Sequence, residues 1–267
     1  MFRYIDIHAH VNFPVFDTDR AEVFERAKEA RVAMINVGTG QETSQQAVDL
    51  ARQYDHSWAI IGLHPTHTTT QLADPDEVIT TTIHEAENFD YGWYKNLASD
   101  PKVVGIGECG LDYFRLEETT KGAQLPIFEQ HIALANEVGK PLMLHIRNAY
   151  DDAFQVLQQE AKVLGNVHFF AGTWEEGKKF LDLGFTLSFT GVVTFAPAYE
   201  ELVRNTPLDM IHAETDCPYV APVPFRGRRN EPVYVVEIVR KIAQIKGLEE
   251  EVVAETLVAN ARRLFNL

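Results

Sequence analysis

Short β-rich runs alternate with amphipathic helical patterns along the whole 267-residue chain. Eight runs have the apolar and β-branched composition of buried strands, namely Tyr4–His8, Ala33–Val37, Trp58–Leu63, Val103–Glu108, Leu142–Ile146, Val167–Phe170, Phe185–Phe189 and Met210–Glu214. Between them, apolar residues recur at helical spacing, as at Leu125, Phe128 and Ile132. Strands that alternate with helices predict a parallel sheet, and eight repeats in this length favour a closed (β/α)8 TIM barrel.

The main alternative is an open, doubly wound α/β sheet, which needs a glycine-rich loop after its first strand. Residues 6–10 read DIHAH there, without glycine. We find no linker or low-complexity stretch, so we expect a single domain over residues 1–267. Helical patterns at Pro232–Lys246 and Glu249–Leu264 predict the last outer helix and an extra C-terminal helix. The segment Asp74–Asp100 lengthens the third loop and helix.

The charge balance limits the range of partners. The chain has 24 Lys and Arg against 39 Asp and Glu, and 24 − 39 gives a formal charge of −15. A broad surface for gripping long nucleic acids is usually basic, so such a surface is disfavoured. There are only two cysteines, no secretory-type start and no apolar run near the roughly 20 residues that span a bilayer. We therefore expect a cytoplasmic protein with no membrane partner and no obligatory protein partner.

Residue types that commonly bind metals lie at the carboxyl ends of the predicted strands, which share one end of the barrel. Four histidines and two carboxylates occupy these positions: His8, His10, Glu108, His145, His168 and Asp216. The carboxyl ends of barrel strands form the catalytic face, so these side chains should converge. A single histidine of this kind is more often a hydrogen-bonded structural residue. Six such groups together predict a metal centre with enough ligands for two ions.

Several longer motifs extend this pattern over nearly the whole chain. They are DIHAH at 6–10, GLHP at 62–65, GECGLDYF at 107–114, LHIRNAYDD at 144–152, VHFFAGT at 167–173, ETDCPYVAP at 214–222, RGRRNEP at 226–232 and NARRLF at 260–265. In these motifs the chain resembles the TatD family of metal-dependent deoxyribonucleases, within the amidohydrolase superfamily. One position departs from the family, which usually has Ser or Thr where this chain has Ala171.

The resemblance implies a metal-dependent hydrolase that acts on ester bonds, with two divalent metal ions (Mg, Mn or Zn). One ion would be held by His8, His10, Glu108 and Asp216. The other would be held by Glu108, His145 and His168, so that Glu108 bridges the two. The implied activity is that of a phosphodiesterase or deoxyribonuclease, as a 3′–5′ exonuclease on single-stranded or short DNA.

The residue chemistry and the resemblance lead to one hypothesis for the mechanism. Asp216 would act as the general base toward the attacking water, with Glu108 and His64 completing the catalytic residues. His64 would hydrogen-bond the phosphate or donate to the leaving oxygen. Further phosphate contacts are expected from basic side chains near the catalytic face: Arg147, Arg226, Arg228 and Arg229.

Two acidic residues have alternative interpretations. Glu214 precedes Asp216 by two positions, so it should share its face and either orient a ligand or contact substrate. Asp112 could cap the next turn or brace a ligand histidine.

The net negative charge disfavours a long basic groove but does not exclude nucleic acid, because a few clustered arginines are enough to bind one or two phosphates. We therefore expect DNA ends or short oligonucleotides as substrates.

Two other functions fit the pattern less well. One is a metal-dependent amidohydrolase or deacylase acting on a small molecule or an aminoacyl nucleic acid. The other is a metal-binding scaffold without activity, which the intact ligand set disfavours.

Overall fold

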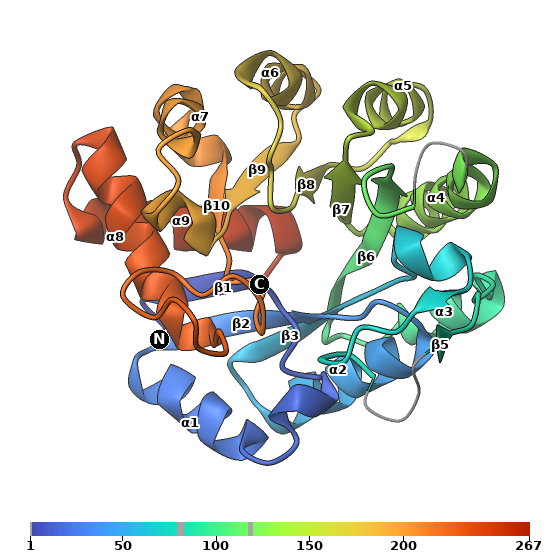
Figure 1. The fold of residues 1–267 in the computed structure, drawn as a ribbon, viewed down its shortest axis with the longest axis horizontal. Helices are drawn as coiled ribbons and strands as arrows, with labels where there is room; N and C mark the ends of the chain where they lie inside the picture. The colour runs from blue at the N-terminus through green and yellow to red at the C-terminus, as the bar shows by residue number, and fades with distance from the viewer. Residues whose placement is uncertain (1, 79–82, 117–119) are drawn as a thin grey trace.

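The computed structural model of the protein describes residues 2–78, 83–116 and 120–267. Its main sheet has eight parallel strands in the order β1-β2-β3-β6-β7-β8-β9-β10. Their bounds are β1 Tyr4–Ala9, β2 Val32–Val37, β3 Ser57–Ile61, β6 Val103–Asp112, β7 Leu142–Arg147, β8 Gly165–Val167, β9 Thr186–Phe189 and β10 Ile211–Ala213. The sheet curls into a nearly closed barrel (Figure 1), so the TIM-barrel prediction is confirmed and the open-sheet alternative is wrong.

The barrel closes between β1 and the segment that follows β10. Ala9 and Cys217 form an isolated parallel bridge. The Asp216 amide donates to the His8 carbonyl at 2.9 Å, and the His10 amide donates to the Cys217 carbonyl at 2.9 Å. The seam thus aligns the first two predicted metal ligands, His8 and His10, with Asp216, which is 208 and 206 positions away from them in the sequence.

Helices surround the strands (Figure 1). They are α1 Arg20–Glu29, α2 Gln41–Gln53, α3 Tyr91–Leu97, α4 Lys121–Val138, α5 Tyr150–Glu160, α6 Trp174–Asp182, α7 Tyr199–Asn205, α8 Val235–Lys246 and α9 Glu250–Phe265. The end of α4 shows how the sequence sets a boundary, since Gly139 there has a φ of 66°. That left-handed conformation favours glycine and terminates the helix.

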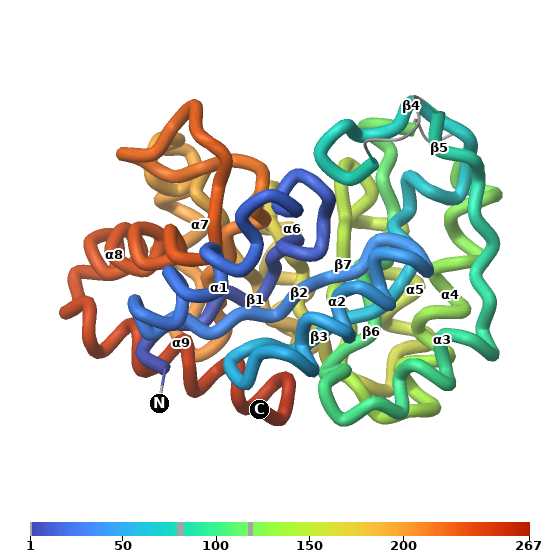
Figure 2. Tube along the Cα trace, turned by 90° about the horizontal axis from the view of Figure 1, so that it is seen from below, coloured from blue at the N-terminus to red at the C-terminus, as the bar shows by residue number. Residues whose placement is uncertain are grey.

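The extra C-terminal helix, α9, lies at the end of the barrel opposite the catalytic face. Its Val258, Ala261 and Phe265 are buried with Ile5, Ile35 and other strand residues in one apolar cluster. Figure 2 shows α9 and both termini on one side of the molecule and strands β4 and β5 on the other. The helix therefore covers the amino-terminal end of the strands, away from the predicted ligands.

The inserted segment after β3 lies over the carboxyl ends of the strands. Its short strands β4 (Gln71–Leu72) and β5 (Ile83–His84) pair antiparallel, and α3 follows them. Residues 79–82 of the Asp74–Asp100 segment lie outside the described residues. Across the described part of the chain, we find no helix with the length and apolarity needed to cross a membrane.

Candidate metal centre

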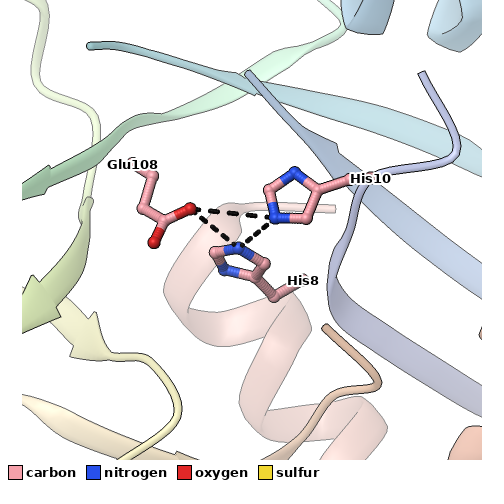
Figure 3. Close-up of side chains that lie close together, drawn as sticks. All are labelled: His8, His10 and Glu108. Carbon is pink, nitrogen blue, oxygen red and sulfur yellow. Dashed lines mark hydrogen bonds and ion pairs between the residues drawn. The ribbon is translucent and has the colours of Figure 1, made fainter. Parts of the chain in front are cut away.

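The carboxylate of Glu108 lies at the centre of a buried group of histidines. Its Oε2 faces the two histidines of β1 and its end, 3.2 Å from His8 Nε2 and 3.8 Å from His10 Nε2. These two ring nitrogens are 3.1 Å apart, so all three atoms point into the same space (Figure 3). Asp216 closes this side, with Oδ1 3.8 Å from His8 Nε2 and 3.5 Å from His10 Nε2. Separations of roughly 3–4 Å are those of atoms that share one metal ion.

The other oxygen of Glu108 faces a second group of histidines. Oε1 lies 2.8 Å from His145 Nδ1 and 3.1 Å from His168 Nε2. His168 follows β8, whereas we expected it within the strand. Each carboxylate oxygen of Glu108 therefore faces a different set of imidazole nitrogens.

Glycines in β6 allow this close approach. Gly107 and Gly110 have φ values of 150° and 142°, which other residues rarely adopt. A Cβ atom at Gly110 would lie 2.0 Å from the carbonyl oxygen of His145, and one at Gly107 would lie 2.4 Å from that of Met143. Only glycine lets β6 approach β7 closely enough to place Glu108 against His145.

In three histidines, a hydrogen bond at the outer ring nitrogen determines that the nitrogen facing the centre has a lone pair instead of a proton. His10 Nδ1 lies 2.9 Å from the Val37 carbonyl, His145 Nε2 lies 2.9 Å from Asp112 Oδ2, and His168 Nδ1 lies 3.2 Å from Glu214 Oε1. An acceptor at one nitrogen of a neutral imidazole places the proton there. The remaining nitrogen then presents a lone pair toward a carboxylate. The lone pair and the carboxylate repel each other, and a cation between them relieves this repulsion. The donor set therefore fits divalent metal ions.

The electrostatics of the centre also favour cations. Burial would raise the pKa of Glu108, but the histidines around it, His64 and His168 foremost, hold that pKa well below its ordinary value. Burial also acts to lower the pKa of His168, yet Glu108 and Glu214 hold it well above the ordinary value. The lowered pKa of Glu108 and the raised pKa of His168 both show that the buried carboxylates of this site stabilise positive charge.

Asp112 and Glu214 hold two of the predicted ligand histidines, His145 and His168, in place. Asp112 combines the two functions proposed for it, since Oδ1 accepts from the amides of Phe114 and Arg115 while Oδ2 faces His145. Glu214 is fully buried and accepts from the Phe169 amide at 2.6 Å and from Ser188 Oγ at 2.8 Å, besides facing His168. Its oxygens are thus occupied within the protein, which favours orientation of a ligand over contact with substrate.

His64 differs from the predicted ligand histidines in which ring nitrogen carries the proton. Its Nδ1 accepts from the Thr66 amide at 3.2 Å, so the proton of the neutral ring is on Nε2. That nitrogen lies 3.3 Å from Glu108 Oε1. Burial lowers the pKa of His64 to about 4. His64 therefore presents a neutral N–H donor to the centre.

These groups line a cavity of about 380 Å³ at the carboxyl ends of the strands. Its wall includes the predicted ligands His10, Glu108, His145, His168 and Asp216, and also His64. Glu214 and Asp112 are not part of the wall. The cavity is thus large enough for part of a nucleotide and is placed where barrel enzymes bind substrate.

Comparison with known proteins identifies the family of the chain. Residues 5–266 match the family described as TatD related DNase. The chain belongs to the TatD family. It is 38% identical to an uncharacterized metal-dependent hydrolase, YabD, of Bacillus subtilis, over 98% of both chains. It is 34% identical to a 3′-5′ ssDNA/RNA exonuclease, TatD, of Erwinia billingiae, again over 98% of both. The crystal structure of YJJV, a TatD homologue from Escherichia coli K12, superposes with a TM-score of 0.85 at 25% identity, covering 99% of this chain and 98% of that one.

The basic residues of this TatD-family chain are not all where we expected them. Arg147 lines the cavity, with its guanidinium 3.9 Å from the centre of the Phe114 ring. Arg115 also lines the cavity, and the sequence reasoning overlooked it although it directly follows the GECGLDYF motif. Arg226 and Arg228 are exposed outside the wall, and Arg226 donates to the Ala221 carbonyl.

The expectation that Arg229 faces the metal centre is wrong. Its guanidinium donates to both carboxylate oxygens of Asp19, at 2.8 and 2.6 Å, and to the Val15 carbonyl at 2.9 Å. Asp19 is also the N-cap residue of α1. Arg229 therefore fastens the loop after β10 to the start of α1. Ala171, the position that departs from the family, does line the cavity.

Proposed function

We propose that this chain is a two-metal phosphodiesterase that removes nucleotides from the 3′ ends of single-stranded or short DNA. The observation that carries the proposal is the placement of the Glu108 carboxylate, with one oxygen facing each group of histidines. Two ions held on either side of one carboxylate suit the in-line displacement at phosphorus. Support for a nuclease comes from the relative named as a 3′-5′ ssDNA/RNA exonuclease.

Ligands for the two ions follow from the two sides of Glu108. His8, His10, Glu108 and Asp216 would hold one ion, and Glu108, His145 and His168 would hold the other. When bound, Mg²⁺, Mn²⁺ or Zn²⁺ would acidify water and neutralise charge on the phosphoryl oxygens. Asp112 and Glu214 keep the rings of His145 and His168 in the orientation that directs their lone pairs inward.

Two side chains of the cavity wall have different functions in the reaction: one accepts a proton and the other donates a hydrogen bond. Asp216 accepts the proton of the attacking water, since its carboxylate borders the cavity as well as His8 and His10. Its backbone has a φ of 54°, an uncommon conformation for a residue with a side chain, and this directs Asp216 toward the centre. His64 is neutral and keeps its proton, so it donates a hydrogen bond through Nε2–H to a phosphoryl oxygen or to the leaving oxygen, and the leaving oxygen takes its proton from water.

Substrate length follows from the distribution of charge. Arg147 and Arg115 are the arginines of the cavity wall, and the chain as a whole carries a formal charge of −15. Two guanidinium groups can hold one or two phosphates, whereas the acidic remainder repels a long polyanion. The proposal therefore specifies strand ends and short oligonucleotides.

End-labelled oligonucleotides test the proposal. Single- and double-stranded DNA with a 5′ label is incubated with the protein and Mg²⁺, Mn²⁺ or Zn²⁺, and products are resolved over time. A ladder that shortens from the 3′ end supports an exonuclease, whereas random internal cuts refute that part of the proposal. Turnover of p-nitrophenyl esters or cyclic amides, with no cleavage of DNA by any metal-loaded sample, would replace it with the amidohydrolase or deacylase alternative.

A further inference from the structure

A second group of histidines and carboxylates lies beside the cavity, outside the centre around Glu108. His67, in the turn that follows β3, His84 at the end of β5, and Glu87 bring one potential ligand atom each within 4.8 Å of the others. The rings of His67 and His84 stack with centroids 3.9 Å apart. His84 Nε2 lies 3.3 Å from Glu87 Oε1.

The hydrogen bonding of His67 repeats the pattern of the ligand histidines. Its Nδ1 lies 2.9 Å from the Thr39 carbonyl, which places the proton of the neutral ring on that nitrogen. Nε2 then directs a lone pair at Glu77, whose Oε2 is 3.3 Å away. The side chains of His67 and Glu77 are 5% and 9% exposed, so water does little to screen the repulsion.

We propose that His67, His84 and Glu87, together with Glu77, form a further metal site that takes Zn²⁺ and fastens the β4–β5 hairpin to the barrel. Two neutral imidazoles and two carboxylates balance the charge of one divalent ion. They also match the nitrogen and oxygen donors of four-coordinate zinc sites. A separate cavity of about 230 Å³ borders His67, His84 and Glu77. The proposal does not depend on the nuclease assignment.

The place of these residues in the chain gives such a site a structural function. His84 and Glu87 belong to the inserted segment, while His67 lies in the short 3₁₀ helix Pro65–Thr68 that follows the barrel strand β3. In the described residues of the insertion, the Glu87 amide donates to the His67 carbonyl at 2.9 Å, and Gln41 at the start of α2 donates to Glu87 Oε2 at 3.4 Å. An ion bound to all these side chains would hold the hairpin beside the catalytic cavity, whose wall His67 and Glu77 share.

Metal counting on the full chain tests the site. The wild type, His84→Gln and Glu87→Gln are stripped with a chelator, reloaded with Zn²⁺, dialysed and analysed by mass spectrometry of the metal. Each variant should retain one equivalent less than the wild type. His56→Gln is the matched control, because His56 is a partly exposed histidine outside these groups, and it should retain the wild-type number.

The number of Zn²⁺ equivalents lost in the variants reports on this site alone, because the residues around Glu108 are the same in every sample. Failure of this proposal can therefore be distinguished from failure of the proposed function. Cobalt provides a second measurement: titration of the wild type with Co²⁺ should give a visible absorption increment that is absent in His84→Gln. Equal metal content in the dialysed wild type and both dialysed variants overturns the proposal. Thermal unfolding of the stripped proteins verifies folding, and a Zn²⁺-dependent rise in Tm should be smaller in the two variants than in the control.

Discussion

Replacement of Glu214 by glutamine tests whether a residue without access to substrate controls the metal centre. Glu214 accepts at one oxygen from the Phe169 amide and faces His168 Nδ1, and at the other it accepts from Ser188 Oγ. The amide oxygen of Gln can keep the first two contacts, and its NH₂ can donate to Ser188, whose hydroxyl also accepts. Glu214→Gln therefore removes the charge behind His168 without leaving a buried polar group unpaired.

The expected loss is in metal affinity rather than in folding. Replacing a group that orients and polarises a ligand histidine typically weakens metal binding by about 10–100-fold. At about 1.4 kcal/mol for each factor of ten, this corresponds to about 1.4–2.8 kcal/mol. The loss should affect the ion bound by His168 and leave the ion on the side of His8 and His10 nearly unchanged, since Glu214 Oε1 contacts the His168 ring.

Calorimetric titration of the stripped protein with Mn²⁺ or Zn²⁺ measures this effect. Glu214→Gln should show one weakened binding step and one unchanged step. Glu250→Gln is the control for charge, because Glu250 is paired with Tyr4 and Arg240 far from the centre. Asp112→Asn should resemble Glu214→Gln, since Asp112 faces His145 in the same way. Wild-type affinity at both steps in Glu214→Gln would refute the reasoning from hydrogen bonds.

Three other changes give separate tests. Asp216→Asn should keep the fold and much of the metal but lower hydrolysis of labelled oligonucleotides by orders of magnitude, and near-wild-type turnover would refute its function as proton acceptor. Arg229→Ala should lower the free energy of unfolding in urea by about 1 kcal/mol at neutral pH. Arg229 holds the pKa of Asp19 below its ordinary value. The difference in unfolding free energy should therefore be present above the pKa of Asp19 in the unfolded chain, and it should fade as the pH falls through the pKa of Asp19 in the folded protein. A difference that does not depend on pH would contradict the pairing. Phe265→Ala should cost about 3–4 kcal/mol, because the 2% exposed ring packs in the cluster shared by α9 and the strands; a change below about 1 kcal/mol would show that α9 does not stabilise the barrel.

The strands were predictable because apolar periodicity is a local property of the sequence. All eight predicted runs overlap strands of the barrel, with errors at their ends. We expected a strand to end at Glu108, but β6 continues to Asp112. We expected Val167–Phe170 to be extended, but β8 ends at Val167 and Phe169 has a φ of 44°. Both errors lie at the candidate metal centre, where contacts between strands outweigh local preference.

The arginines were harder to place because their partners are remote in the sequence. A run of three arginines after the last strand suggested phosphate binding, but Asp19, the partner of Arg229, is 210 positions away. Nothing in the local sequence distinguishes an arginine that fastens a loop from one that faces a cavity. The group formed by His67 and His84 was missed for the same reason, since a hairpin in the inserted segment brings the two rings together.

The difference between ligand and donor histidines also depends on structure. His10 and His64 both follow barrel strands, and the sequence offers the same imidazole at each position. In the folded chain a carbonyl oxygen faces His10 Nδ1, whereas an amide N–H faces His64 Nδ1. The first contact directs a lone pair at the centre and the second directs a proton there. A backbone group beyond each ring thus decides whether a histidine can bind a metal ion or donate to a phosphate oxygen. The side chains of Asp112 and Glu214 have the same effect on His145 and His168 as the Val37 carbonyl has on His10, because each faces one ring nitrogen and leaves the other toward Glu108.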